Sequence, residues 1–251
     1  MDLVAYRNEE IEKVRTNDLM ALLPDDCRGS VLDIGARDGW FSRLLAKKFD
    51  QVTALDLEKP SITHPRIQCV KGDATDLEFE SGEYDLVFCA EVLEHIPSEQ
   101  LQKACAELER VANRYILIGV PFKQDIRICR TKCYTCGKRN PPWGHVNSFD
   151  ELRLKKLFPR CDARKMSFVG EESKCTNALS VFLLDFAGNP DGPYYQGEPC
   201  IHCGAKLIEP PKLNILQKVA TRVAFSIIDK QQRFHRSHPK WIHILFEKRR
   251  A

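Results

Sequence analysis

The chain has 251 residues, 43% of them hydrophobic, and a formal net charge of +3. This length suits one α/β domain with an insertion, or two small domains, and the apolar content excludes a globally disordered protein. No apolar run reaches the roughly 18 residues of a membrane span. The N-terminus also lacks the basic-then-apolar pattern of a signal peptide, so we expect a cytoplasmic protein.

Cysteine and charge are unevenly distributed along the chain. Four of the eleven cysteines lie in apolar segments and are expected to be buried thiols: Cys27, Cys69, Cys89 and Cys105. Residues 211–251 hold ten Lys or Arg and two Asp or Glu, a net charge of +8. Such a segment would suit an anionic surface or RNA, and a solvated helix face explains it equally well.

Strands and helices alternate through the first half of the chain. The predicted helices span 8–24, 40–49 and 98–112, the last capped by Ser98, and the predicted strands span 30–35, 51–58, 67–74, 84–92 and 114–122. This alternation predicts a parallel, doubly wound α/β sheet.

The alternation stops after Pro121. Residues 123–147 are polar and contain cysteines, and residues 188–204 have the composition of a loop. The remaining elements are expected as a helix over 148–158 capped by Ser148, a strand over 163–171, a helix over 212–233 and a final strand over 241–249. The apolar run 178–186 fits a strand or a helix.

Three strand ends carry residues suited to a nucleotide-like ligand, which in such sheets binds beyond the carboxyl ends of the strands. Gly35 and Gly39 permit a tight turn after the first strand. Arg37 replaces the middle glycine of a dinucleotide fingerprint, which favours a ligand without pyrophosphate. Asp56 lies 21 residues after Gly35, where a carboxylate accepts both ribose hydroxyls. Asp73 is placed to accept from an adenine amino group.

Together with Glu91, Glu94 and His95 after the fourth strand, these stretches of residues 28–122 resemble class I S-adenosylmethionine-dependent methyltransferases. The resemblance is greatest to the broad type 11 group, which includes ubiquinone-pathway O-methyltransferases. It implies a seven-stranded Rossmann-like sheet whose last strand is antiparallel. It also implies cofactor-binding roles for Asp33, Gly35, Ala36, Gly39, Asp56, Leu57, Asp73, Ala74 and Glu91.

Two histidines are candidates for the chemistry. Methyl transfer from a sulfonium needs mainly alignment, but a hydroxyl acceptor must also lose a proton. His145 begins a stretch that resembles the family's H-x-x-x-F motif, and we predict it as the acceptor-side base. His95 faces the cofactor end, where a capping or supporting role is the alternative to catalysis. His145 also lies near a cysteine pair, so a role as metal ligand stays open.

Two C-x-x-C-G motifs predict a zinc site. Cys133 and Cys136 form one pair and Cys200 and Cys203 the other, with 63 residues between the two pairs. Four thiolates are the tetrahedral set of structural zinc, and glycine after the second cysteine can adopt a positive φ. We expect the ion to hold the His145 segment and residues 188–204 together as a lid over the acceptor pocket.

Three units are predicted: a cofactor-binding core over 1–122, a zinc-binding insertion with acceptor-side elements over 123–210, and a basic helix and final strand over 211–251. The expected function is O-methylation of a sugar, a lipid-linked glycan or a small metabolite. RNA or protein is the alternative acceptor, and a non-catalytic zinc-binding adaptor with a relic cofactor fold is the alternative function. The charged face of a helix over 212–236 is expected beside the acceptor entrance.

Overall fold

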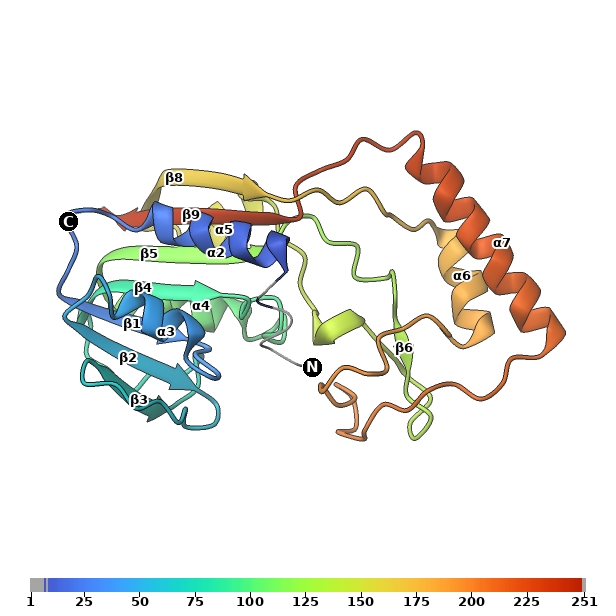
Figure 1. The fold of residues 1–251 in the computed structure, drawn as a ribbon, viewed down its shortest axis with the longest axis horizontal. Helices are drawn as coiled ribbons and strands as arrows, with labels where there is room; N and C mark the ends of the chain where they lie inside the picture. Colours follow the sequence, from blue (N-terminus) through green and yellow to red (C-terminus); the bar gives the residue numbers. More distant parts are fainter. Residues whose placement is uncertain (1–6, 8, 250–251) are drawn as a thin grey trace.

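The protein is built around one seven-stranded sheet (Figure 1). The structure is a computed structural model that describes residue 7 and residues 9–249. The strands of the sheet are β1 (Ser30–Ile34), β2 (Gln51–Asp56), β3 (Ile67–Lys71), β4 (Tyr84–Ala90), β5 (Ala112–Pro121), β8 (Cys161–Val169) and β9 (Trp241–Lys248). Their order is β3-β2-β1-β4-β5-β9-β8, and β9 runs antiparallel to both of its neighbours. The predicted sheet with an antiparallel last strand is therefore confirmed.

Helices cover both faces of this sheet, which explains why its central strands are largely apolar, whereas the edge strands β3 and β8 are more exposed. The helices are α2 (Glu10–Leu22), α3 (Trp40–Leu45), α4 (Leu101–Val111) and α5 (Glu151–Leu157). Apolar side chains of α2 and α3 pack with Val31 and Leu117 in one core. Those of α4 and α5 pack with Leu32 and Ile118 in the other. Neighbouring strand residues thus point to opposite faces, as the pleat requires.

Two predicted helix caps are wrong. Ser98 donates through Oγ to Oδ1 of Asn147 at 3.0 Å, and the N-cap position of α4 is occupied by Gln100. At α5 the carboxylate of Asp150, not Ser148, accepts from the backbone N–H of Arg153 at 2.8 Å. At α4 the serine hydroxyl is used by a tertiary contact, and at α5 the helix begins two residues later than predicted, so that Asp150 occupies the cap position.

The undecided run 178–186 is helical. It forms α6 (Ala178–Ala187), where Asn177 and Ser180 make a capping box. The predicted basic helix is α7 (Ile215–Gln232). The two helices pack on each other around Leu184, Ala224 and Ile228, and they lie apart from the sheet (Figure 1).

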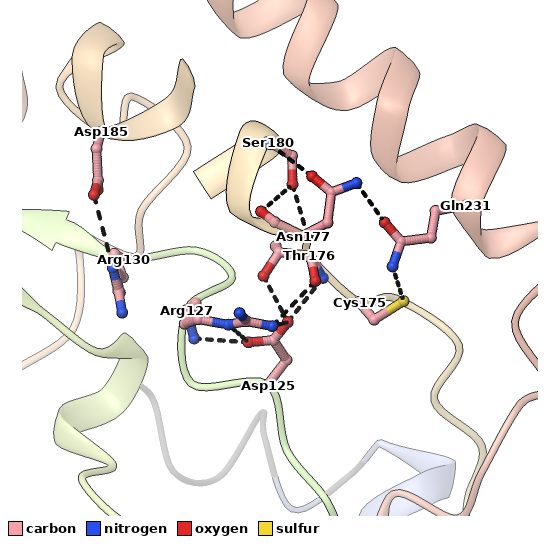
Figure 2. A network of polar contacts seen from close by, with 9 residues as sticks. All are labelled: Asp125, Arg127, Arg130, Cys175, Thr176, Asn177, Ser180, Asp185 and Gln231. Atoms are coloured by element: carbon pink, nitrogen blue, oxygen red, sulfur yellow. Dashed lines mark hydrogen bonds and ion pairs between the residues drawn. The ribbon is translucent and has the colours of Figure 1, made fainter. Parts of the chain in front are cut away.

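A polar network fixes this helical pair to the segment that leaves β5 (Figure 2). The carboxylate of Asp125 accepts from Arg127 and from the backbone N–H and hydroxyl of Thr176. One residue further, Asn177 donates to Gln231 of α7 at 2.9 Å. Because Arg130 also pairs with Asp185 of α6 at 3.7 Å, the helices and the cysteine-bearing segment are held together.

Two short strands flank the first cysteine pair: β6 (Thr131–Lys132) and β7 (Arg139–Asn140), which pair antiparallel. A short 3₁₀ turn follows at Pro142–Gly144 and leads into His145. Among the described residues, no helix has the length and apolarity to cross a membrane.

Candidate active site

A cavity of about 400 Å³ opens at the carboxyl ends of β1 and β4. Most of its wall comes from the ends of these strands, from α2 and from the segment around His145. Six of the predicted site residues line it: Asp33, Gly35, Ala36, Glu91, His95 and His145. The tertiary structure thus brings the glycine turn and both candidate histidines to one space.

The turn after β1 has the conformation that its glycines predict. Gly35 and Gly39 have φ of 76° and 78°, and Arg37 between them also has a positive φ of 47°. A Cβ on Gly35 would lie 2.4 Å from Val92 Cγ2, so no larger residue fits there. Arg37 adopts the left-handed conformation that the usual glycine would supply, and its N–H donates to Asp56 at 2.9 Å. The tight turn survives the loss of that glycine.

Five predicted cofactor residues are not part of the cavity wall: Gly39, Asp56, Leu57, Asp73 and Ala74. Asp56 accepts from the N–H groups of Arg37 and Leu57, through different carboxylate oxygens. Each oxygen keeps a lone pair for a ribose hydroxyl. Asp73 is exposed at the end of β3, and it accepts from the N–H of Thr75 at 2.8 Å.

Carboxylates that are buried or half-buried line part of the cavity. Asp33 is 2% exposed and accepts from Ser42 Oγ at 2.5 Å, and burial raises its pKa to about 7. Glu91 has a left-handed φ of 58° and lies 3.5 Å from the guanidinium of Arg15. Arg15 also pairs with Glu12 at 2.7 Å. A backbone held in this region by a non-glycine residue is typical of functional sites.

Sequence reasoning missed several residues of the wall. Arg15 and Glu12 come from α2, and Gln124 and Trp143 come from the segment after β5. Only Glu12 and Arg15 could have been identified from the sequence, because they are two charges three residues apart on the inner face of an amphipathic helix. Gln124 and Trp143 lie in a polar loop whose path the sequence does not define.

The two histidine rings meet edge to face. Their centroids lie 4.6 Å apart at an interplanar angle of 89°. Nδ1 of His145 lies 2.7 Å from Oε1 of Gln124. An amide oxygen only accepts, so Nδ1 carries the proton and Nε2 keeps its lone pair. Burial, with the charge of His95, lowers the pKa of His145 to about 3. Burial also lowers the pKa of His95, so both rings are neutral at pH 7.

Glu94 lies next to this histidine pair. Its side chain is fully buried, and burial raises its pKa well above the usual range, with the charge of Glu91 adding to the effect. Ligand atoms of Glu94, His95 and His145 all lie within 4.8 Å of one another. One carboxylate and two imidazoles at this spacing are a donor set for a divalent cation.

The four cysteines of the two motifs converge, although 63 residues separate the pairs. Sγ of Cys133 lies 3.7 Å from Sγ of Cys203, and Sγ of Cys136 lies 3.7 Å from Sγ of Cys200. A disulfide would require about 2 Å, whereas four sulfurs 2.3 Å from a central ion lie roughly 3.8 Å apart. The spacing therefore fits a tetrahedral ion. His145 is not part of this cluster.

Both cysteine motifs fold the same way. Gly137 donates to the carbonyl of Cys133 and Gly204 to that of Cys200, each at 2.8 Å. Both glycines have the positive φ expected from the motif, 74° and 70°. Hydrogen bonds from the backbone of Cys136 and Thr135 lower the pKa of Cys133 to about 6, which favours the thiolate that a metal binds.

Segments next to the cysteine cluster form one side of the cavity. The N–H of Trp143 donates to Gln196 at 2.8 Å, and the Trp143 ring lies 5.8 Å from that of Tyr195. Gly197 and Glu198 line the cavity together with Trp143 and His145. The segment 188–204 and the segment before His145 therefore meet over the same space.

The expected position of the basic helix is wrong. None of the residues of α7 lines the cavity, and the C-terminal segment contributes Lys240 and Trp241 instead. The physical reason is that α7 buries Ala224 and Ile228 against Leu184 of α6 rather than against the sheet.

Known proteins match this chain in the region of the glycine turn. Residues 32–114 match the family model described as "Methyltransferase domain". Ubiquinone biosynthesis O-methyltransferase of Pectobacterium atrosepticum is 32% identical over 89 residues, 31% of this chain and 37% of that protein. The match thus spans little more than a third of the length of this curated relative.

Two solved structures share the fold. The N-methyltransferase NodS from Bradyrhizobium japonicum is 14% identical, with a TM-score of 0.54 over 97% of this chain and 99% of that chain. The 1,6-didemethyltoxoflavin-N1-methyltransferase of Burkholderia thailandensis was solved with 1,6-didemethyltoxoflavin and S-adenosylhomocysteine. It is also 14% identical, with a TM-score of 0.54 over 98% of this chain and 81% of that chain. Residues 32–114 are therefore similar to a methyltransferase domain, and the chain shares its fold with these two solved methyltransferases.

Proposed function

We propose that the protein transfers a methyl group from S-adenosylmethionine to a hydroxyl of a sugar, a lipid-linked glycan or another small metabolite. The observation that carries this proposal is the composition of the cavity. The glycine turn and Asp33 lie at one part of its wall, and His95 and His145 lie at another. Cofactor and acceptor would meet between them.

The reaction is an in-line displacement. The S–CH₃ bond breaks as the O–CH₃ bond forms, S-adenosylhomocysteine leaves, and the hydroxyl proton passes to a base. Gln124 fixes the ring of His145 so that Nε2 is the free nitrogen. Asp56, anchored by the N–H groups of Arg37 and Leu57, would accept the ribose hydroxyls of the cofactor.

Calorimetry of S-adenosylmethionine binding tests the assignment. Asp56→Ala is expected to weaken binding by about 1.5–3 kcal/mol, or roughly 10–100-fold, because hydrogen bonds to a charged group are lost. Asp56→Asn keeps an acceptor oxygen for the Arg37 N–H. Comparing it with Asp56→Ala therefore separates the effect of losing the charge from the effect of loosening the turn. Asp162→Ala, an exposed carboxylate on β8, serves as the control.

Two results would count against the proposal. Unchanged affinity in a folded Asp56→Ala protein would remove the ribose role. No binding of S-adenosylmethionine by the unmodified protein would instead favour the non-catalytic adaptor.

We further propose that the cysteine cluster binds one structural zinc ion. Cys133 and Cys200 are buried, and Cys136 and Cys203 are exposed. Four thiolates leave no open position for water or substrate, so this ion would stabilise the fold around it rather than take part in catalysis.

The helical pair supports an anionic bilayer as the partner of the basic segment. Leu179, Phe182 and Phe186 are exposed on α6, and Leu216, Val219 and Val223 are exposed on α7. Lys218 and Arg222 are exposed on the same helix α7. Four of these six side chains are aliphatic and cannot stack on bases as the two phenylalanines could, so a bilayer interface suits this surface better than RNA does.

Vesicle sedimentation tests the bilayer proposal. Lys218→Gln with Arg222→Gln should weaken binding to phosphatidylserine-containing vesicles about 30-fold, at about 1 kcal/mol for each cation near the surface. Lys155→Gln with Lys156→Gln removes two exposed cations of α5 and should have no effect. Equal losses in both variants would refute a specific surface, and RNA affinity that falls steeply with salt would favour the RNA alternative.

A further inference from the structure

Glu94 is an unusual group that methyl transfer alone does not explain. Its side chain is 0% exposed, and neither carboxylate oxygen has a hydrogen-bond partner among the described residues. Burying a carboxylate without a partner is expensive, and buried carboxylates are normally paired or bound to a metal. A positive group next to Glu94 would remove this cost.

The neighbouring histidine is oriented as a metal ligand would be. Nδ1 of His145 donates to Gln124, which directs the free Nε2 lone pair away from that contact. Metal-binding histidines typically have their second nitrogen held in this way.

Backbone hydrogen bonds hold the two segments in register. The carbonyl of Glu94 accepts from the N–H of Val146 at 2.8 Å and of Asn147 at 3.2 Å. The side chain of Asn147 donates in turn to the carbonyls of Leu93 and Ile96, at 3.0 and 2.6 Å. The positions of Glu94 and His145 are thus fixed by the backbone, without help from contacts between their own side chains.

We propose that Glu94, His95 and His145 bind a first-row divalent cation, at a site separate from the four cysteines. Their ligand atoms lie within 4.8 Å of one another, and small side-chain rotations would bring each to about 2.1 Å from one ion. Three protein ligands leave coordination positions open, as in catalytic rather than structural metal sites. His95 and His145 both line the cavity, so the open positions face it.

Resting on the proposed function, this placement defines the acceptor more narrowly. A hydroxyl oxygen bound at an open position would be polarised by the ion and would lose its proton more readily. An acceptor with two adjacent hydroxyls could occupy two such positions. Binding of the ion itself requires neither cofactor nor acceptor, so its test is independent of methyl transfer.

Mn²⁺ is the probe, because it stands at the weak end of the divalent affinity order and does not displace thiolate-bound zinc. Metal analysis of the purified protein, followed by titration with Mn²⁺, should account for one ion per chain beyond the cysteine-bound one. Glu94→Gln should lower affinity for that ion at least about 100-fold. Gln124→Ala, which frees the His145 ring, should lower it about 10–100-fold.

Glu109→Gln is the matched control, because Glu109 is 6% exposed and accepts from the N–H of Arg160, away from the histidine pair. It should bind the ion as the unmodified protein does. Glu94→Gln should fold, since an amide has nearly the shape of the carboxyl group and carries no charge to bury, and His145→Gln is a second variant if it does not. No second ion in the unmodified protein, or equal affinity in Glu94→Gln and Glu109→Gln, would overturn the proposal.

Discussion

His145→Ala is expected to lower the turnover number about 10²–10⁴-fold, the usual contribution of a group that handles the acceptor proton. The affinity for S-adenosylmethionine should stay within about twofold, because His145 belongs to the part of the wall formed with Trp143 and Gln124, not to the glycine turn. Single-turnover kinetics with the identified acceptor, together with cofactor calorimetry, measure the two quantities.

His235→Ala is the control, because this histidine is exposed beyond the end of α7 and takes no part in the cavity wall. Unchanged turnover in His145→Ala would remove the residue from the mechanism. Loss of turnover together with loss of Mn²⁺ binding would mean that His145 acts as a metal ligand. Loss of turnover with intact Mn²⁺ binding would leave it as the base.

Cys200→Ser combined with Cys203→Ser should abolish zinc binding, because two of four thiolates cannot hold the ion tightly. The binding free energy of structural zinc is about 10–16 kcal/mol in small zinc-binding peptides and is coupled to folding. Loss of the ion should therefore release the segments 131–140 and 198–206 and expose them to protease. Metal analysis and limited proteolysis would show both effects.

Activity should fall more than cofactor binding in this variant, for a geometric reason. The segment that leads into His145 is packed against the second cysteine motif: a Cβ on Gly144 would lie 3.7 Å from Nδ1 of His95 and 4.0 Å from Ile201. The strands that carry the glycine turn contain no zinc ligand.

Cys27→Ser with Cys105→Ser, two buried thiols of the sheet domain, should keep the zinc. Full zinc content after loss of Cys200 and Cys203 would refute the four-cysteine site.

The sequence by itself determined the sheet and the turn at its ligand end. Strands covered on both faces must be apolar along their whole length, so their positions are visible in composition alone. The turn was predictable as well, because the positive φ of Gly35 and Gly39 is a conformation that glycine adopts readily. Both C-x-x-C-G turns could also be predicted from the sequence, because the backbone hydrogen bonds that form each turn lie within six consecutive residues.

The arrangement of residues on the acceptor side of the cavity is visible only in the tertiary structure. The contact of Gln124 with His145, and the meeting of Trp143 with Gln196, join segments whose loops carry no periodic pattern. The unpaired state of Glu94 is a property of what surrounds it, which no local pattern encodes. The position of α7 was missed because its stripe of small and apolar residues fits a sheet and a helix equally well. That α7 packs against α6 is visible only in the folded structure.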